Sequence, residues 1–190
     1  DEYHQQLRAY HDQDLKGQLN NPVWHIHGGD VPESKMVVPF SMLLNLASVA
    51  SAHDKETLWG FIRRYAPDAT PQTHPDLDAA AGFAVKYYED FVEPQKVFRA
   101  PSDAERAALE EFRGKLASWD GETTGEALQG IVFEVGREHF GKENMRDWFK
   151  ALYEVLLGAS QGPRFGGFVA LYGVEETVAL IDKALAGELV

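Results

Sequence analysis

The chain has 190 residues, 44% hydrophobic and 12% aromatic, which is enough to bury the core of one large domain or two small ones. It contains no cysteine, so disulfides and thiolate zinc sites are excluded and a reducing, cytoplasmic setting fits best. The 30 acidic and 18 basic residues give a net charge of −12, which on its own argues against nucleic acid as a partner.

The first half of the chain has a helical periodicity that breakers interrupt. Residues 1–19 predict a polar helix, whereas residues 20–39 contain three pairs of breakers and are expected to be irregular. The mostly apolar residues 40–52 predict a central, buried helix, and Asp54 can cap the helix that follows. Apolar residues at three-to-four spacing then predict a long helix over 77–91.

The proline-bounded stretch 94–101 is the best internal boundary of the chain. It divides an expected first region, 1–95, from a second one, 96–190. The second region opens with a capping-box pattern at Ser102, and Thr123 begins a similar pattern. Each pattern predicts the start of a helix.

Three more helices are predicted towards the end of the chain. Asn144 is expected to cap the first and Gly158 to end it, while the other two cover 165–172 and 174–185. With no convincing strand-like alternation anywhere, the predicted fold is all-α, a multi-helix bundle of about nine helices with short connections and no sheet.

Two local patterns imitate metal or catalytic sites. His25, His27 and Asp30 carry metal-ligating groups, but they lie in a breaker-rich segment, so local hydrogen bonding is the favoured interpretation. The carboxylates of Glu110 and Glu111 point about 100° apart on a helix and cannot converge on one atom. No nucleophile–base set or phosphate loop stands out, so the sequence predicts neither a metal site nor a catalytic residue.

The stretch from residue 137 to residue 164 is the only long one that escapes the acidic bias of the chain. Five basic and four acidic residues lie there, and charge alone favours an ordinary solvated helix surface over an RNA contact. Arg164 follows a Gly/Pro loop at the start of a helix, where a guanidinium and free N–H groups would suit a phosphate or an unstacked base. A plain helix–helix connection is the alternative.

Two separated blocks of the chain resemble one known family. Residues 152–158, 161–166 and 168–173 closely resemble the C-terminus of class I lysyl-tRNA synthetases, and more loosely that of bacterial glutamyl-tRNA synthetases. Residues 21–28 and 39–46 resemble the segment that follows the catalytic fold in the lysyl family. Because both blocks agree in order, the resemblance covers nearly the whole chain.

The resemblance implies a helical stem-contact region followed by a helical anticodon-binding domain. The parent enzyme would use ATP to activate lysine and would attach it to tRNA(Lys). This portion would lack the Rossmann domain, so it would bind no cofactor and catalyse nothing alone. Its partners would be tRNA(Lys) and the catalytic domain of the same chain, in a monomer. No apolar run is long enough to span a membrane, so no membrane contact is expected.

Under this interpretation the chain would read unpaired bases of single-stranded RNA. The candidate RNA-binding residues lie in the basic stretch or directly beside it: Arg137, Arg146, Lys150, Arg164, Trp148 and Phe165. The four cations would hold phosphates and the two rings would carry bases, although a core position is the alternative for each ring.

Two rival functions remain open. The first is a helical interaction or scaffold domain that kept the fold but lost RNA binding, which the net charge of −12 supports. The second is an independent enzyme, for which the sequence offers no candidate site. Gathering of the five basic residues on one surface would favour RNA binding.

Overall fold

The computed structural model describes all 190 residues and contains helices without any strand. The all-α prediction is therefore confirmed. Eleven α-helices follow one another along the chain, with short π- and 3-10 turns after α6 and α9: α1 (Glu2–Asp12), α2 (Leu15–Asn20), α3 (Pro22–His27), α4 (Phe40–Val49), α5 (Lys55–Tyr65), α6 (Pro75–Tyr87), η1 (Tyr88–Val92), η2 (Glu93–Gln95), α7 (Asp103–Ala117), α8 (Gly125–Phe140), α9 (Met145–Leu152), η3 (Tyr153–Leu157), α10 (Phe165–Tyr172) and α11 (Val174–Ala186).

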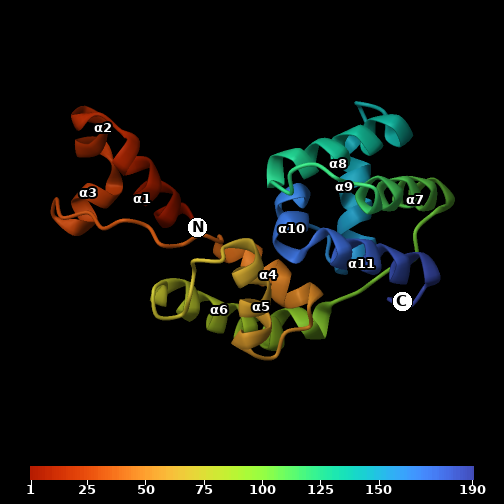
Figure 1. The fold of residues 1–190 in the computed structure, drawn as a ribbon, viewed down its shortest axis with the longest axis horizontal. Coiled ribbons are helices and arrows are strands. Elements are labelled where there is room, and N and C mark those ends of the chain that lie inside the picture. The colour runs from red at the N-terminus through yellow and green to blue at the C-terminus, as the bar shows by residue number, and fades with distance from the viewer.

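The first three helices form a small unit that stands apart from the rest (Figure 1). Its core is a cluster of three buried side chains, Leu7, Tyr10 and Val23. The prediction of irregular structure over 20–39 is wrong for α3. Pro22 occupies its first turn, where the missing N–H costs nothing, and the side chain of Asn21 accepts the Val23 N–H at 3.0 Å.

The helices α4, α5 and α6 enclose the second core. Leu43, Leu46, Leu58 and Trp59 are almost completely buried in it, as the apolar periodicity of these helices predicts. Asp54 accepts the Thr57 N–H at 2.8 Å, which confirms the predicted cap of α5. Most of this core therefore comes from helices that are adjacent in the chain.

The helices α7 to α11 enclose the largest core. The capping box at Ser102 is confirmed, because Ser102 and Glu105 exchange side-chain and backbone hydrogen bonds at the start of α7. The cap of α8 is Thr124, one residue later than predicted, and it accepts the Ala127 N–H at 3.3 Å. Asn144 stands at the start of α9 but makes no side-chain cap.

The helix α10 joins the two large cores. Its Phe168 is buried in the core of α7 to α11, whereas its Leu171 belongs to the core of α4 to α6. At its C-terminal end, the ring of Tyr172 stacks on Phe61 of α5 at 5.3 Å between centroids. In Figure 1 it accordingly lies between the other helices of the two regions.

The start of α10 crosses α8 so closely that the backbones of the two helices are in contact. A methyl group on Gly166 would lie 2.3 Å from the Gln129 nitrogen and 2.5 Å from the Gly125 carbonyl oxygen. The buried amide of Gln129 also accepts the Gly166 N–H at 2.8 Å. A glycine is therefore required for this close approach, and the crossing fixes how α10 sits on α8.

Candidate functional site

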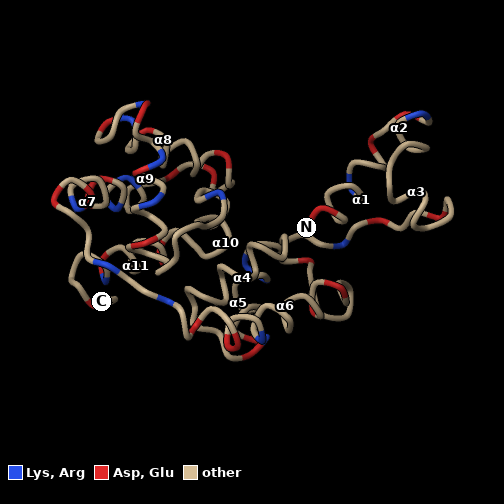
Figure 2. Tube along the Cα trace, turned by 180° about the vertical axis from the view of Figure 1, so that it is seen from behind, with Lys and Arg blue, Asp and Glu red and all other residues tan.

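All five basic side chains of the stretch 137–164 are exposed: Arg137, Lys142, Arg146, Lys150 and Arg164. Only Lys150 has a carboxylate within ion-pair distance, with its Nζ 3.7 Å from Oε1 of Glu154. The other four cations are free of ion pairs. Figure 2 shows basic and acidic positions interleaved along the trace of these helices.

Two of these cations share a hollow that sequence reasoning did not find. Arg137 and Lys142 line it together with Gly130, Phe133 and Met145, and its volume is about 340 Å³. Phe133 is 42% exposed, so part of its ring is open to solvent. The hollow therefore combines an open aromatic face with two cations that lack carboxylate partners.

The exposed ring of Phe133 is held by aromatic neighbours. Phe149 of α9 meets it nearly edge-on, with centroids 5.6 Å apart and an interplanar angle of 80°. The ring of Tyr153 stacks on Phe149, and the Tyr153 hydroxyl donates to the Pro163 carbonyl at 2.8 Å. Burial raises the pKa of the Tyr153 phenol. The phenol therefore stays a neutral donor that pins the loop before α10.

The two rings proposed as stacking platforms are core residues. Trp148 and Phe165 are 0% exposed. Trp148 lies edge-on to Phe112 and donates its Nε1–H to the Val132 carbonyl at 2.9 Å, while Phe165 packs against Phe112 and Phe168. Neither ring offers a face to a base, so the platform interpretation of both is corrected to the core alternative.

Arg164 occupies the N-cap position of α10, with its side chain exposed. The sequence suggested that free helix N–H groups would lie beside it, yet the Gly166 N–H is already donated to Gln129. Gly166 packs against Gly125 and Gln129 in the first turns of α8. Arg137 lies in the last turn of that helix, so α8 separates Arg164 from the hollow.

The histidine pattern near the N-terminus makes local hydrogen bonds. Nε2 of His25 lies 3.0 Å from the Leu19 carbonyl, and Nε2 of His27 lies 2.8 Å from the Tyr3 hydroxyl. No group of three metal-ligating side chains is gathered in the chain. The favoured interpretation of local hydrogen bonding is confirmed.

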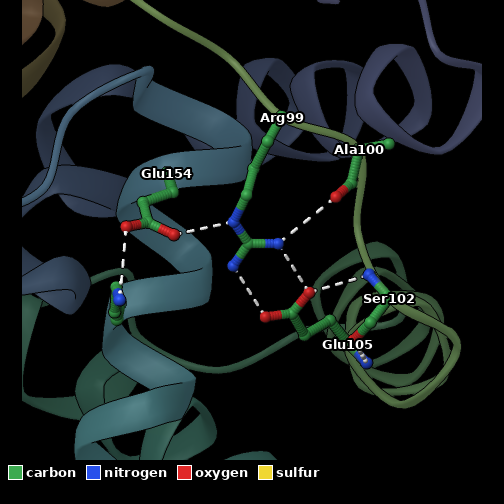
Figure 3. A network of polar contacts seen from close by, with 6 residues as sticks. Arg99, Ala100, Ser102, Glu105 and Glu154 are labelled. Carbon is green, nitrogen blue, oxygen red and sulfur yellow. Dashed lines mark hydrogen bonds and ion pairs between the residues drawn. The ribbon is translucent and has the colours of Figure 1, made fainter.

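The densest polar network ties the segment before α7 to the rest of the second region. Figure 3 shows the Arg99 guanidinium between Glu105 of α7 and Glu154 of η3. Two of its N–H groups donate to the carboxylate of Glu105 and its Nε donates to Glu154, each at 2.7 Å. Arg99 holds the pKa of Glu105 down at about 2 and lowers that of Glu154. The same carboxylate of Glu154 also forms an ion pair with Lys150.

We expect this network to make stability depend on pH. The pKa of Glu105 is about 2 in the folded chain against 4.5 ordinarily, so the unfolded chain binds the extra proton between these values. The stabilisation is complete above pH 4.5 and is lost as pH falls towards 2. Because Arg99 is partly solvated, we expect a contribution of about 1–2 kcal/mol.

Urea unfolding of the wild type and of Glu105→Gln measures this contribution. The variant should be less stable by about 1–2 kcal/mol at neutral pH. The difference should shrink when both proteins are unfolded at about pH 2.5. An equal difference at both pH values would contradict the assignment of the low pKa to the ion pair.

Comparisons with known proteins place the chain in a family. No protein-family model matches it. It is 70% identical over 189 residues to the lysine–tRNA ligase of Roseobacter denitrificans, across 100% of this chain and 36% of that protein. It is 43% identical over 187 residues to the lysine–tRNA ligases of Rickettsia felis and Rickettsia conorii, across 97% of this chain and 35% and 36% of those proteins. The chain belongs to the lysine–tRNA ligase family.

The family membership concerns one portion of such an enzyme. The chain spans 36% of the length of the Roseobacter lysine–tRNA ligase. The hollow at Phe133 brings an exposed aromatic ring together with two cations that have no ion-pair partner. None of the helices has both the length and the apolar character that crossing a membrane requires.

Proposed function

We propose that the chain is the tRNA-binding portion of a class I lysine–tRNA ligase and that its second region reads the anticodon of tRNA(Lys). One observation carries the proposal. In a relative of lysine–tRNA ligases, the exposed ring of Phe133 lies in a hollow with Arg137 and Lys142, which have no ion-pair partner. Unpaired bases are recognised by stacking on aromatic rings, and their phosphates by cations.

The proposal assigns different contacts to the two regions. Residues 1–95 would contact the stem of the tRNA, and residues 96–190 would bind the anticodon. Their separate hydrophobic cores, in α4 to α6 and in α7 to α11, support this division. The complete enzyme would activate lysine with ATP in its catalytic domain, which together with tRNA(Lys) would be the partner of this portion, in a cytoplasmic monomer.

A scaffold function is the second candidate, and the charges favour it. The net charge is −12, and Lys150 of the predicted set is engaged by Glu154. Phosphates attract cations whose charge is not already neutralised, so an RNA site must rely on the remaining ones. Arg137 and Lys142 gather at one hollow, whereas Arg164 lies towards the other end of α8.

A binding titration at two salt concentrations tests the proposal. The 190-residue chain should bind a tRNA(Lys) transcript more tightly than the same transcript with a substituted anticodon. Affinity should fall as salt rises, because phosphate contacts release counterions. Equal affinity for both transcripts would contradict anticodon reading, and no binding at low salt would favour the scaffold.

The cation Arg146 gives a sharper version of this test. Arg146→Gln should weaken the binding of both transcripts and lower the salt slope by about 1 if this side chain holds a phosphate. Lys183→Gln is the matched control, because it removes the same charge from an exposed position on α11 that has no ion pair. If both variants weaken binding equally, the effect comes from net charge and Arg146 is no specific contact.

A further inference from the structure

The hollow at Phe133 has the chemistry of a binding subsite. Phe133 and Arg137 lie one turn apart on the solvent side of α8, and Lys142 follows in the connection to α9. The volume of about 340 Å³ lies at the lower end of the range for small-ligand sites. It would suit a ligand of the size of one nucleotide.

Both cations at this hollow have N–H donors that bind no other group of the chain. The guanidinium of Arg137 uses only Nε within the chain, donating to the Phe133 carbonyl at 3.2 Å. This bond fixes the guanidinium beside its own aromatic neighbour and leaves its terminal amino groups free. Lys142 makes no side-chain hydrogen bond or ion pair, and the nearby Glu134 is neutralised by Lys115 at 3.1 Å. The exposed acid Glu138 points about 100° around α8 from Arg137.

A glycine, Gly130, lines the hollow beside the ring of Phe133. Gly130 lies about one turn before Phe133 on the same side of α8, and a methyl group there would meet no atom within 4 Å. A long side chain such as leucine at this position has room to extend into the hollow, because the position is exposed and the added Cβ meets no neighbouring atom. Glycine has low helix propensity, so its presence in the middle of α8 costs stability while it leaves the ring accessible.

The other two exposed phenylalanines lack these conditions. Phe91 is 55% exposed and lines a groove with Lys96 and Arg99, but both cations donate to groups of the chain itself. Phe83 is 67% exposed and shares a hollow with Asp76, an acid that repels phosphate. Of the exposed phenylalanines, Phe133 is the one with free cations around an open face.

We propose that Phe133 is a stacking platform for one unpaired base of single-stranded RNA, with Arg137 and Lys142 holding the phosphates that flank this base. The proposal rests on the proposed tRNA-binding function and names the place where it acts. Stacking has no strong base preference, so this subsite supplies affinity for an unpaired loop and leaves the choice of base to other contacts.

Two matched pairs of variants test the platform against a short single-stranded oligouridine RNA and tRNA(Lys). Phe133→Leu removes the ring face and should weaken oligouridine binding about 5- to 150-fold without changing the salt slope, whereas Phe133→Tyr should bind like the wild type. Gly130→Leu fills the hollow and should weaken binding at least about tenfold. Gly114→Leu is its control, since Gly114 is an exposed glycine of α7 with equally open surroundings.

Substitution of the two cations should change the salt dependence of RNA binding, which substitution of Phe133 should leave unchanged. Arg137→Gln and Lys142→Gln should each lower the salt slope by about 0.7, the value expected for one phosphate of a single strand. A blunt RNA duplex should bind with the same affinity to the wild type and to Phe133→Leu, because its bases are not available for stacking. Circular dichroism melting curves confirm that each variant is folded.

The outcomes separate this subsite from the wider function. Unchanged RNA affinity in both Phe133→Leu and Gly130→Leu would overturn the subsite, and anticodon-dependent binding of tRNA(Lys) by the same proteins would leave the proposed function in place. If the wild-type chain binds neither RNA, both proposals fail. Loss of affinity in both variants, with Phe133→Tyr and Gly114→Leu unaffected, would establish the platform.

Discussion

Trp148→Ala is expected to lower the free energy of unfolding by about 3–5 kcal/mol, the range found for large aromatic side chains deleted from a core. The ring is completely buried, lies edge-on to Phe112 at 6.1 Å and stacks on Phe140 at 5.7 Å. Its indole N–H also donates to the Val132 carbonyl. The substitution removes all these contacts and leaves a cavity between α7, α8 and α9.

Urea unfolding measures this loss, and RNA binding separates the core role of Trp148 from a platform role. Trp148→Leu keeps an apolar side chain in the cavity and should remain folded with a smaller loss of stability. The affinity of this folded variant for tRNA(Lys) should stay within about twofold of the wild type, because no base reaches the buried ring. A large loss of affinity without a loss of stability would restore the platform interpretation.

Gly166→Ala is expected to lower the free energy of unfolding by about 3 kcal/mol, at the upper end of the usual cost of overpacking. The added methyl group would meet backbone atoms of Gly125 and Gln129 at 2.3–2.6 Å, and backbone atoms of a packed helix cannot turn aside. The helices α8 and α10 must move apart instead. This weakens the hydrogen bond from the Gly166 N–H to Gln129 and loosens α10, which joins the two large cores.

The neighbouring glycine supplies the control. Gly167→Ala adds the same methyl group one residue later, where the nearest atom is the flexible end of Met42 at 3.3 Å. It should change stability by less than about 1 kcal/mol, since the alanine also favours the helix. For a chain of this length the Gly166 variant should melt about 6–12 °C lower. Equal melting temperatures of the two variants would show that the crossing can relax.

Several cations of the stretch 137–164 have no ion-pair partner, and they lie in an otherwise acidic chain. Arg137, Lys142 and Arg146 are not neutralised by carboxylates, although the chain as a whole carries a charge of −12. The surrounding acids oppose non-specific binding to RNA, because they repel phosphates that lie outside the site. Under the proposed function, affinity would therefore come from a few local contacts.

Most of the helices after residue 40, and most of their ends, could be predicted from the sequence. Local signals explain this success, since caps and apolar spacing act within a few residues. Asp54 and Ser102 cap where they were expected to, and Gly158 adopts the left-handed conformation that ends η3. The helix α3 was missed because the pair Asn21-Pro22 breaks one helix and also starts the next.

The packing of the helices against one another decides which side chains face the solvent and which charges pair between distant parts of the chain. Phe133 lies directly after the buried Val132, and its exposure depends on where α9 and the connection at Lys142 pack. The sequence did carry one signal of this exposure: Phe133 lies off the buried stripe of α8, one turn before Arg137. The spacing of Trp148, four residues before the buried Leu152, likewise indicated the core. Lys150 lies four residues before Glu154, so this ion pair is local and its spacing was visible in the sequence. Arg99, which also binds Glu154, lies 55 residues earlier in the chain. Such distant contacts arise only when the helices pack, because periodicity records the helix to which a residue belongs and not the neighbour that covers it.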